Sequence, residues 1–108
     1  MNPEDKERWV KALRSGKYKQ GKGRLYDGRK YCCLGVLCRT EGLRSRDQED
    51  YPGYRSFSFE GESMDTNLSF PFIRYLGITE DQANHCVTMN DADGKSFNQI
   101  ADWIEENL

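Results

Sequence analysis

The sequence predicts a small α+β domain with four or five short helices and one β-hairpin. Helix-start signals recur along the chain, and an Asp-Gly dipeptide joins two short runs that carry tyrosine and basic residues. No internal repeat or low-complexity tract interrupts the 108 residues. A chain of this length is expected to form one domain around a single core. We therefore treat residues 1–108 as one domain, in which residues 43–68 are a variable loop or insertion.

The first helix is predicted from the residues that follow Asn2. Its side chain suits the capping of free backbone N–H groups, and Pro3 suits the first helical position. Trp9 and Leu13 lie on one helical face, and Gly16 is expected to end the helix.

Residues 24–31 are predicted to form the hairpin. Asp27-Gly28 is a strong signal for a two-residue turn in which both residues have positive φ. The next segment, "YCCLGVLCRTEG", has apolar residues at helical spacing and ends at Gly42. Gly35 inside this helix is expected to permit close packing against a neighbour.

Residues 43–68 are the least regular part of the chain. Aromatic and polar residues alternate within 54–60, which predicts one strand or a small hairpin. Helices are predicted to follow at "FPFIRYLG" and behind two capping boxes, "TEDQ" from Thr79 and "SFNQ" from Ser96.

The charges are unevenly distributed along the chain. Residues 1–46 carry 13 Lys and Arg against 5 Asp and Glu, whereas residues 47–108 carry 3 against 13. Either the two halves attract one another across the fold, or a basic face binds a phosphate-bearing partner. No apolar run approaches the ~20 residues of a membrane span, and the charged start is unlike a secretory signal. We therefore expect a cytoplasmic protein with no membrane partner.

The four cysteines are expected to be reduced and buried. The spacing of Cys32, Cys33 and Cys38 does not match the paired ligands of zinc sites. Neighbours along a helix point in different directions, so His85 and Cys86 do not form a nucleophile pair. Pairing of His85 with a cysteine distant in sequence is left open. We predict no metal and no cofactor, and a thiol- or metal-dependent enzyme is the weakest alternative.

Two further motifs resemble ligand-binding loops without matching them. "GKYKQGKG" has Gly23 where a P-loop needs Ser or Thr, and a hairpin is expected where the P-loop has a helix. "NDADGK" fails as a calcium loop because Ile100 occupies the position of the bidentate Glu. Asn90, Asp91 and Asp93 are expected instead to form an Asx-type turn that positions the Ser96 cap. We find no catalytic residues and predict that the chain is not an enzyme.

Two candidate binding surfaces remain. The first is the basic hairpin, whose cations would hold phosphate and whose tyrosines would stack a base: Lys17, Lys19, Lys22, Arg24, Tyr26, Arg29 and Lys30. The second is an aromatic and charged loop for a protein partner: Tyr51, Tyr54, Arg55, Phe57 and Phe59.

The segments "WVKALRSG", "YCCLGVLCRTEG", "PFIRYLGI" and "MNDADGKSFNQIAD" share a pattern with known sequences. Together they resemble a family of small uncharacterised proteins encoded by tailed bacteriophages. That family has a Trp-x-x-Ala-Leu-Arg-Ser-Gly helix, a Cys-Cys-Leu-Gly-Val-Leu-Cys segment, and an Asn-Asp pair before Ser-Phe-x-x-Ile-Ala-Asp. The resemblance spans nearly the whole chain except residues 43–68. The chain departs from the pattern at Arg39, where the family has Asp.

The resemblance implies a setting, the cytoplasm of an infected host cell, and no specific activity. Small phage proteins without catalytic residues are expected to be accessory proteins that bind and modulate or inhibit a host protein or defence complex. The alternative is a protein that binds or sequesters a phosphorylated nucleotide or nucleic acid through the basic hairpin. The sequence does not predict the oligomeric state.

Overall fold

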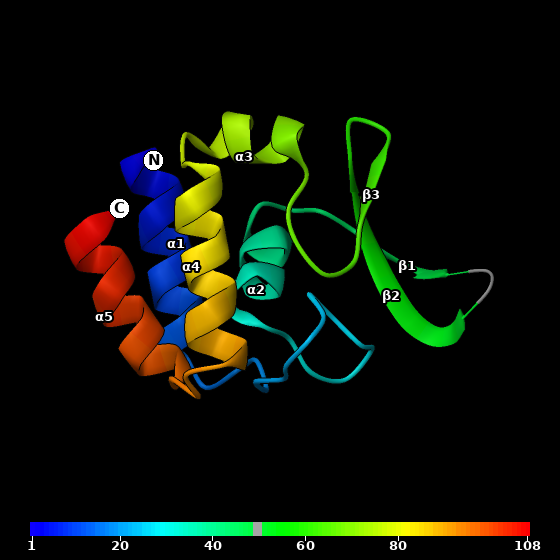
Figure 1. Ribbon diagram of the computed structural model, residues 1–108, viewed down its shortest axis with the longest axis horizontal. Coiled ribbons are helices and arrows are strands. Elements are labelled where there is room, and N and C mark those ends of the chain that lie inside the picture. Colours follow the sequence, from blue (N-terminus) through cyan, green and yellow to red (C-terminus); the bar gives the residue numbers. More distant parts are fainter. Residues whose placement is uncertain (49–50) are drawn as a thin grey trace.

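The computed structural model describes residues 1–48 and 51–108, apart from the side chains of residues 48 and 51–54. Five helices and a three-stranded antiparallel sheet occur in these residues, which confirms the predicted α+β class (Figure 1). The elements are α1 (Pro3–Arg14), α2 (Cys33–Thr40), β1 (Ser45–Gln48), β2 (Tyr51–Phe59), β3 (Glu62–Met64), α3 (Phe70–Leu76), α4 (Glu80–Asp91) and α5 (Phe97–Asn107). None of the described helices is long and apolar enough to cross a membrane.

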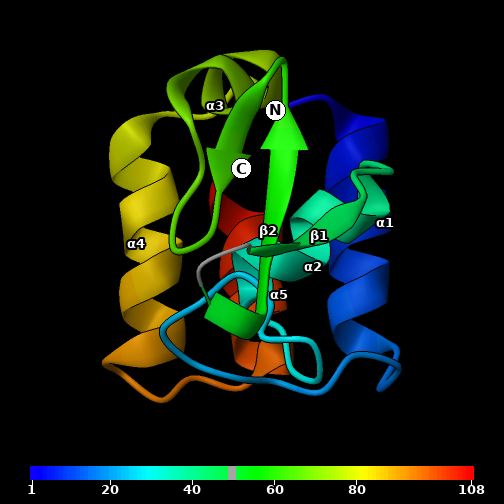
Figure 2. The same cartoon turned by 90° about the vertical axis from the view of Figure 1, so that its right-hand side faces the viewer.

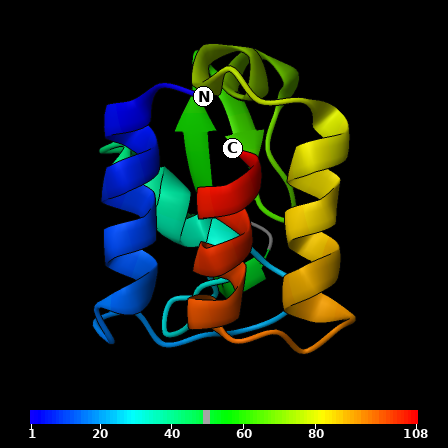
Figure 3. The ribbon, with the colours of Figure 1, turned by 90° about the vertical axis from the view of Figure 1, so that its left-hand side faces the viewer.

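Helix α2 lies at the centre of the fold. Helices α1, α5 and α4 stand side by side in one layer, and α2 lies between that layer and the sheet (Figures 1 and 3). The sheet has the order β1-β2-β3, and Phe57 pairs with Ser45 on one side and Met64 on the other. Every residue from 33 to 38 is buried, so α2 provides the middle of the core.

The predicted helix ends are confirmed. The Asn2 side chain accepts a hydrogen bond from the Glu4 N–H at 2.8 Å. The capping boxes at Thr79 and Ser96 both form, with the hydroxyl and the glutamine side chain each bonding as expected. Gly77, with φ of 72°, ends α3 in the left-handed conformation.

Gly35 permits the close approach that its position in a buried helix predicts. A Cβ atom on Gly35 would lie 1.7 Å from the Leu25 carbonyl oxygen. That oxygen also accepts a hydrogen bond from the Cys32 N–H at 3.2 Å. The segment before α2 is therefore held directly against the helix, with Leu25 fully buried.

The predicted hairpin at 24–31 closes through a single bridge between Tyr26 and Tyr31, not through a two-stranded ribbon. Its turn also differs from the expected type, because Asp27 does not have positive φ. Instead the Asp27 carboxylate accepts hydrogen bonds from the N–H groups of Arg29 and Lys30, at 2.8 and 2.7 Å. The turn is thus held by the Asp27 side chain together with the backbone bond from the Asp27 N–H to the Lys30 carbonyl oxygen at 3.1 Å.

The chain forms its two-residue hairpin elsewhere, between β2 and β3. Phe59 pairs with Glu62, and the intervening Glu60 and Gly61 have φ of 49° and 83°. Positive φ at both positions is the type I′ pattern, which favours Asn, Asp or Gly at the first position. A side chain larger than these in the left-handed region costs about 1 kcal/mol. Strand β2 confirms the strand predicted within 54–60, whereas β1 was not predicted.

Candidate functional site

The basic loop, residues 17–30, lies at the end of the molecule opposite α3 (Figures 1 and 2). Five of its predicted cations are exposed and make no ion pair within the described part of the chain: Lys17, Lys19, Lys22, Arg29 and Lys30. Arg24 is half-buried, and its Nη1 lies 3.9 Å from Asp65 Oδ2. The loop thus presents a set of cations to solvent.

The tyrosines beside these cations pack on one another. Tyr26 stacks on Tyr31 with ring centroids 4.1 Å apart, and Tyr18 meets Tyr31 edge-on at 5.1 Å. The Arg39 guanidinium lies 5.6 Å from the Tyr26 ring and donates hydrogen bonds to the Tyr31 hydroxyl at 3.2 and 3.3 Å. Burial raises the pKa of Tyr26, and the adjacent Tyr31 raises it further. The predicted stacking of a base on Tyr26 would have to displace these contacts.

The predicted aromatic loop is divided between the core and the surface. Phe57 has no exposed surface, so its prediction as a partner contact is corrected: it is a core residue between β1 and β3. Arg55 Nη1 lies 2.7 Å from Asp47 Oδ1 on the neighbouring strand. Phe59 is half-buried, and the predictions for Tyr51 and Tyr54 lie outside the described side chains.

An aromatic patch made by Phe59, Phe70 and Tyr75 was missed at the sequence level. Phe70 is 65% exposed and Tyr75 is 59% exposed, and they are the only large hydrophobic side chains exposed among the described residues. The Phe59 ring lies 5.2 Å from the Tyr75 ring, so the sheet and α3 contribute to one surface. Helical spacing offered a signal, because Phe72, Ile73 and Leu76 define the buried face and leave 70 and 75 off it.

A hollow of about 540 Å³ adjoins this patch. Its lining residues come from the β2–β3 turn, β3 and α3, and these elements lie close together at the upper end of Figure 2. Its lining combines apolar, acidic and basic side chains: Glu60, Glu62, Phe70, Pro71, Arg74 and Tyr75.

All four cysteine thiols are buried. The Cys33 thiol donates to the Cys86 carbonyl oxygen at 3.4 Å. The neighbouring Cys86 side chain and burial raise the pKa of Cys33, and burial raises the pKa of Cys32 to about 11. The His85 ring lies against Trp103, with centroids 4.7 Å apart. Buried, protonated thiols are poor nucleophiles and poor metal ligands.

No group of three or more His, Cys, Asp and Glu side chains in the described residues is arranged to hold a metal ion.

Asn90 has a different position from the one the sequence predicts. Asn90 and Asp91 are the last residues of α4 and not a turn that positions Ser96. The buried Asn90 Oδ1 accepts hydrogen bonds from Gln20 Nε2 and the Cys33 N–H, at 2.9 and 3.2 Å. Its Nδ2 donates to Gly21 O and Asp91 Oδ1, both at 2.8 Å. Asn90 therefore ties the basic loop and the first N–H of α2 to α4.

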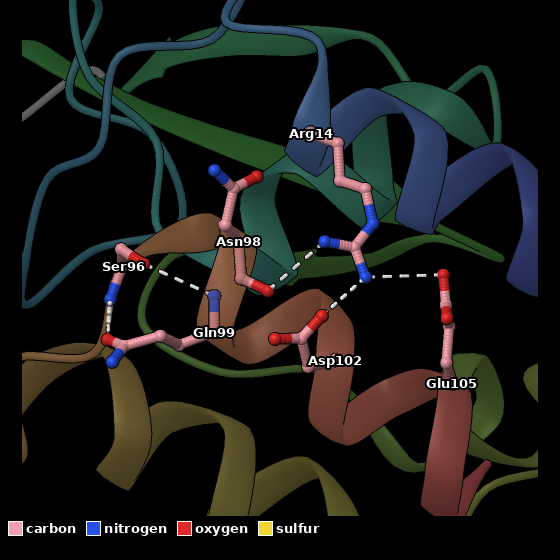
Figure 4. A network of polar contacts seen from close by, with 6 residues as sticks. All are labelled: Arg14, Ser96, Asn98, Gln99, Asp102 and Glu105. Atoms are coloured by element: carbon pink, nitrogen blue, oxygen red, sulfur yellow. Dashed lines mark hydrogen bonds and ion pairs between the residues drawn. The ribbon is translucent and has the colours of Figure 1, made fainter.

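Opposite charges from the two halves of the sequence meet between α1 and α5. Arg14 Nη2 lies 2.6 Å from Asp102 Oδ1 and 3.3 Å from Glu105 Oε1, and Nη1 donates to the Asn98 carbonyl oxygen (Figure 4). The hydrogen bonds to the two carboxylates raise the pKa of Arg14, that to Asp102 most. Attraction across the fold thus accounts for this part of the charge asymmetry, while the basic loop keeps its cations exposed.

A family model described as "Domain of unknown function (DUF8296)" matches residues 1–65. The match runs from α1 through the basic loop and α2 to the end of the sheet. No curated protein and no solved structure matches the chain.

Proposed function

We propose that this chain, which belongs to the DUF8296 family of unknown function, binds and modulates a protein of a bacterial host without catalysing a reaction. The phage setting of this proposal comes from the resemblance of the Cys-Cys-Leu-Gly-Val-Leu-Cys and Ser-Phe-x-x-Ile-Ala-Asp segments to tailed-phage proteins. The aromatic patch is the observation that carries the proposal.

The patch has the composition of a protein-binding surface. Single exposed apolar residues are common, but Phe70 and Tyr75 border the same hollow, and the Tyr75 ring contacts that of Phe59. Aromatic side chains beside a concavity are typical of the residues that dominate binding energy at protein interfaces. The burial of the cysteines, together with their raised pKa values, favours binding over thiol chemistry.

Affinity capture from bacterial cells tests the proposal with a matched pair of variants. A tagged wild-type chain is expected to retain one partner in fixed stoichiometry. The double variant Phe70→Ser/Tyr75→Ser should lose at least about 90% of it, because hot-spot truncations cost more than 1.4 kcal/mol. The control Asn98→Ser/Glu106→Ser changes two exposed residues of α5 and should retain the partner.

Circular dichroism and thermal melting establish that each variant is folded. A folded double variant that retains the partner as well as the wild type does would contradict the proposal. Repeated capture without any partner would contradict it too.

A second function is favoured by the basic loop, namely binding of a nucleic acid or phosphorylated nucleotide. Its exposed cations suit phosphate, while the packing of Tyr26 on Tyr31 makes contacts to phosphate a better fit than stacking on bases. Fluorescence polarisation with labelled duplex DNA, single-stranded RNA and nucleotides tests this alternative. Affinity for nucleic acid should fall steeply with salt and fall further in Lys19→Gln/Lys22→Gln/Lys30→Gln, but little in Lys11→Gln. Salt-independent or undetectable binding would exclude it.

A further inference from the structure

The turn beside the aromatic patch holds a residue that the fold does not favour there. Glu60 is the only non-glycine residue with positive φ among the described residues. Asn, Asp and Gly are the residues that this position of a type I′ turn prefers. Strained backbone of this kind concentrates at functional sites, where the side chain has a use that outweighs the strain.

The carboxylates near the turn are not used by the fold. Glu60 and Glu62 are exposed, and neither makes an ion pair or a side-chain hydrogen bond within the described residues. Both line the hollow next to Phe70 and Tyr75, together with a single cation, Arg74. The charged groups of the hollow are thus two carboxylates against one guanidinium.

We infer that the hollow receives an arginine side chain from the partner, flanked in the partner's sequence by an aliphatic or aromatic residue that packs on the aromatic patch. This inference rests on the proposed function and specifies the chemistry of its partner.

The chemistry of the lining favours arginine over other side chains. The carboxylates of Glu60 and Glu62 offer acceptors for the fork of N–H donors that a guanidinium presents. The exposed aromatic side chains of Phe70 and Tyr75 suit contact with a cation, and the methylene stem of arginine covers apolar surface as its head reaches the acids. An acidic segment would meet two carboxylates with only Arg74 to offset their repulsion, and a purely apolar segment would leave the carboxylates desolvated.

The test uses the full-length chain labelled with ¹⁵N and three capped peptides, Gly-Arg-Leu-Arg-Leu-Gly and its counterparts with Glu for Arg or Ser for Leu. The Arg-Leu peptide is expected to shift amide resonances within residues 59–62 and 70–76. Peptides that lack the arginines or the leucines should bind at least about fivefold more weakly, a loss of roughly 1 kcal/mol.

The variant Glu60→Asn separates binding from folding. Asn suits the type I′ turn, so Tm should rise by a few degrees while the affinity for the Arg-Leu peptide falls at least about threefold. The matched control Glu106→Asn, on the exposed face of α5, should leave that affinity unchanged.

Three outcomes would overturn the inference: no shift at millimolar peptide, equal binding of the acidic peptide, or full affinity in Glu60→Asn. Its failure differs from failure of the proposed function. A captured partner that is lost with Phe70→Ser/Tyr75→Ser but retained with Glu60→Asn supports the protein-binding function and rejects the arginine contact.

Discussion

Asn90 is the buried polar side chain on which the packing around α2 depends. Its side-chain amide forms hydrogen bonds with groups from two helices and the basic loop. The N-terminus of α2 has no side-chain cap from its own N-cap residue. A buried amide that satisfies several partners stabilises a fold mainly because its loss leaves those partners unpaired.

Asn90→Ala is therefore expected to lower the free energy of unfolding by about 3 kcal/mol. The reason is that the Cys33 N–H and the Gly21 carbonyl would lose their bonds to the amide. Urea denaturation measures the change. Asn98→Ala removes an exposed amide and should cost less than about 0.5 kcal/mol, so equal losses in both variants would contradict this account.

Glu41 makes the junction of α1 and α2 sensitive to pH. Its side chain is 4% exposed, and burial raises its pKa to about 7, with a further contribution from Asp5. The opposing cation is Arg8, whose Nη2 lies 3.8 Å from Glu41 Oε1 and also pairs with Asp5. Because the pKa in the folded state lies above the ordinary value of 4.5, the folded state binds the proton more tightly than the unfolded state.

The stabilisation from this proton is complete below pH 4.5 and is lost as pH rises through about 7. Glu41→Gln, which resembles the protonated form, should remove this dependence and be more stable than the wild type at pH 8 by on the order of 2 kcal/mol. Urea denaturation between pH 4.5 and 8 measures the difference, with exposed Glu106→Gln as the control. A constant difference between wild type and Glu41→Gln over this range would contradict the assignment.

At the scale of the elements, the helices differ in whether the side chain of the residue before them caps their N-terminus. Thr79 and Ser96 accept the N–H groups of Gln82 and Gln99, at 3.0 and 3.2 Å. Ser69 occupies the same position before α3 but makes no such bond. Thr79 and Ser96 thus stabilise the helices that they precede by capping them, whereas Ser69 does not.

Thr79→Ala and Ser96→Ala should each lower the free energy of unfolding by about 1 kcal/mol, since each leaves a helix N–H without its cap. Ser69→Ala serves as the matched control and should be nearly neutral, because its buried hydroxyl has no hydrogen-bond partner in the described structure. Urea titration of the three variants tests the ranking. If Ser69→Ala lowered the free energy of unfolding as much as the other two variants do, the Ser69 hydroxyl would have to stabilise the fold, contrary to this account.

At the scale of the whole molecule, the reactivity of the four cysteine thiols measures how often the core becomes exposed by unfolding. They come from α2, its N-terminal flank and α4, and all are buried in the same core. Core groups become accessible only in openings whose free energy approaches that of complete unfolding.

The native chain should therefore react with an aromatic disulfide reagent at least about a thousandfold more slowly than the urea-unfolded chain. Absorbance of the released thiolate follows both reactions, and all four cysteines should react after unfolding. One thiol that reacts rapidly in the native state would contradict the inert core and restore the thiol-enzyme alternative.

Features that depend on neighbours within one helical turn could be predicted from the amino-acid sequence. The ends of α1, α4 and α5 follow from Asn2 and from the two capping boxes, because a cap bonds residues only two or three positions away. The exposed cations of the basic loop were equally predictable, since unpaired lysines stay in water.

Contacts that join distant parts of the chain depend on how the elements pack and could not be predicted in this way. Phe57 is buried because β1 and β3 flank it, and Asn90 is structural because Cys33, 57 residues away, presents an uncapped N–H to it. The aromatic patch likewise forms only where the β2–β3 turn meets α3. Alternating or helical spacing shows which residues share a face, but packing between elements determines which face meets water and which meets the core.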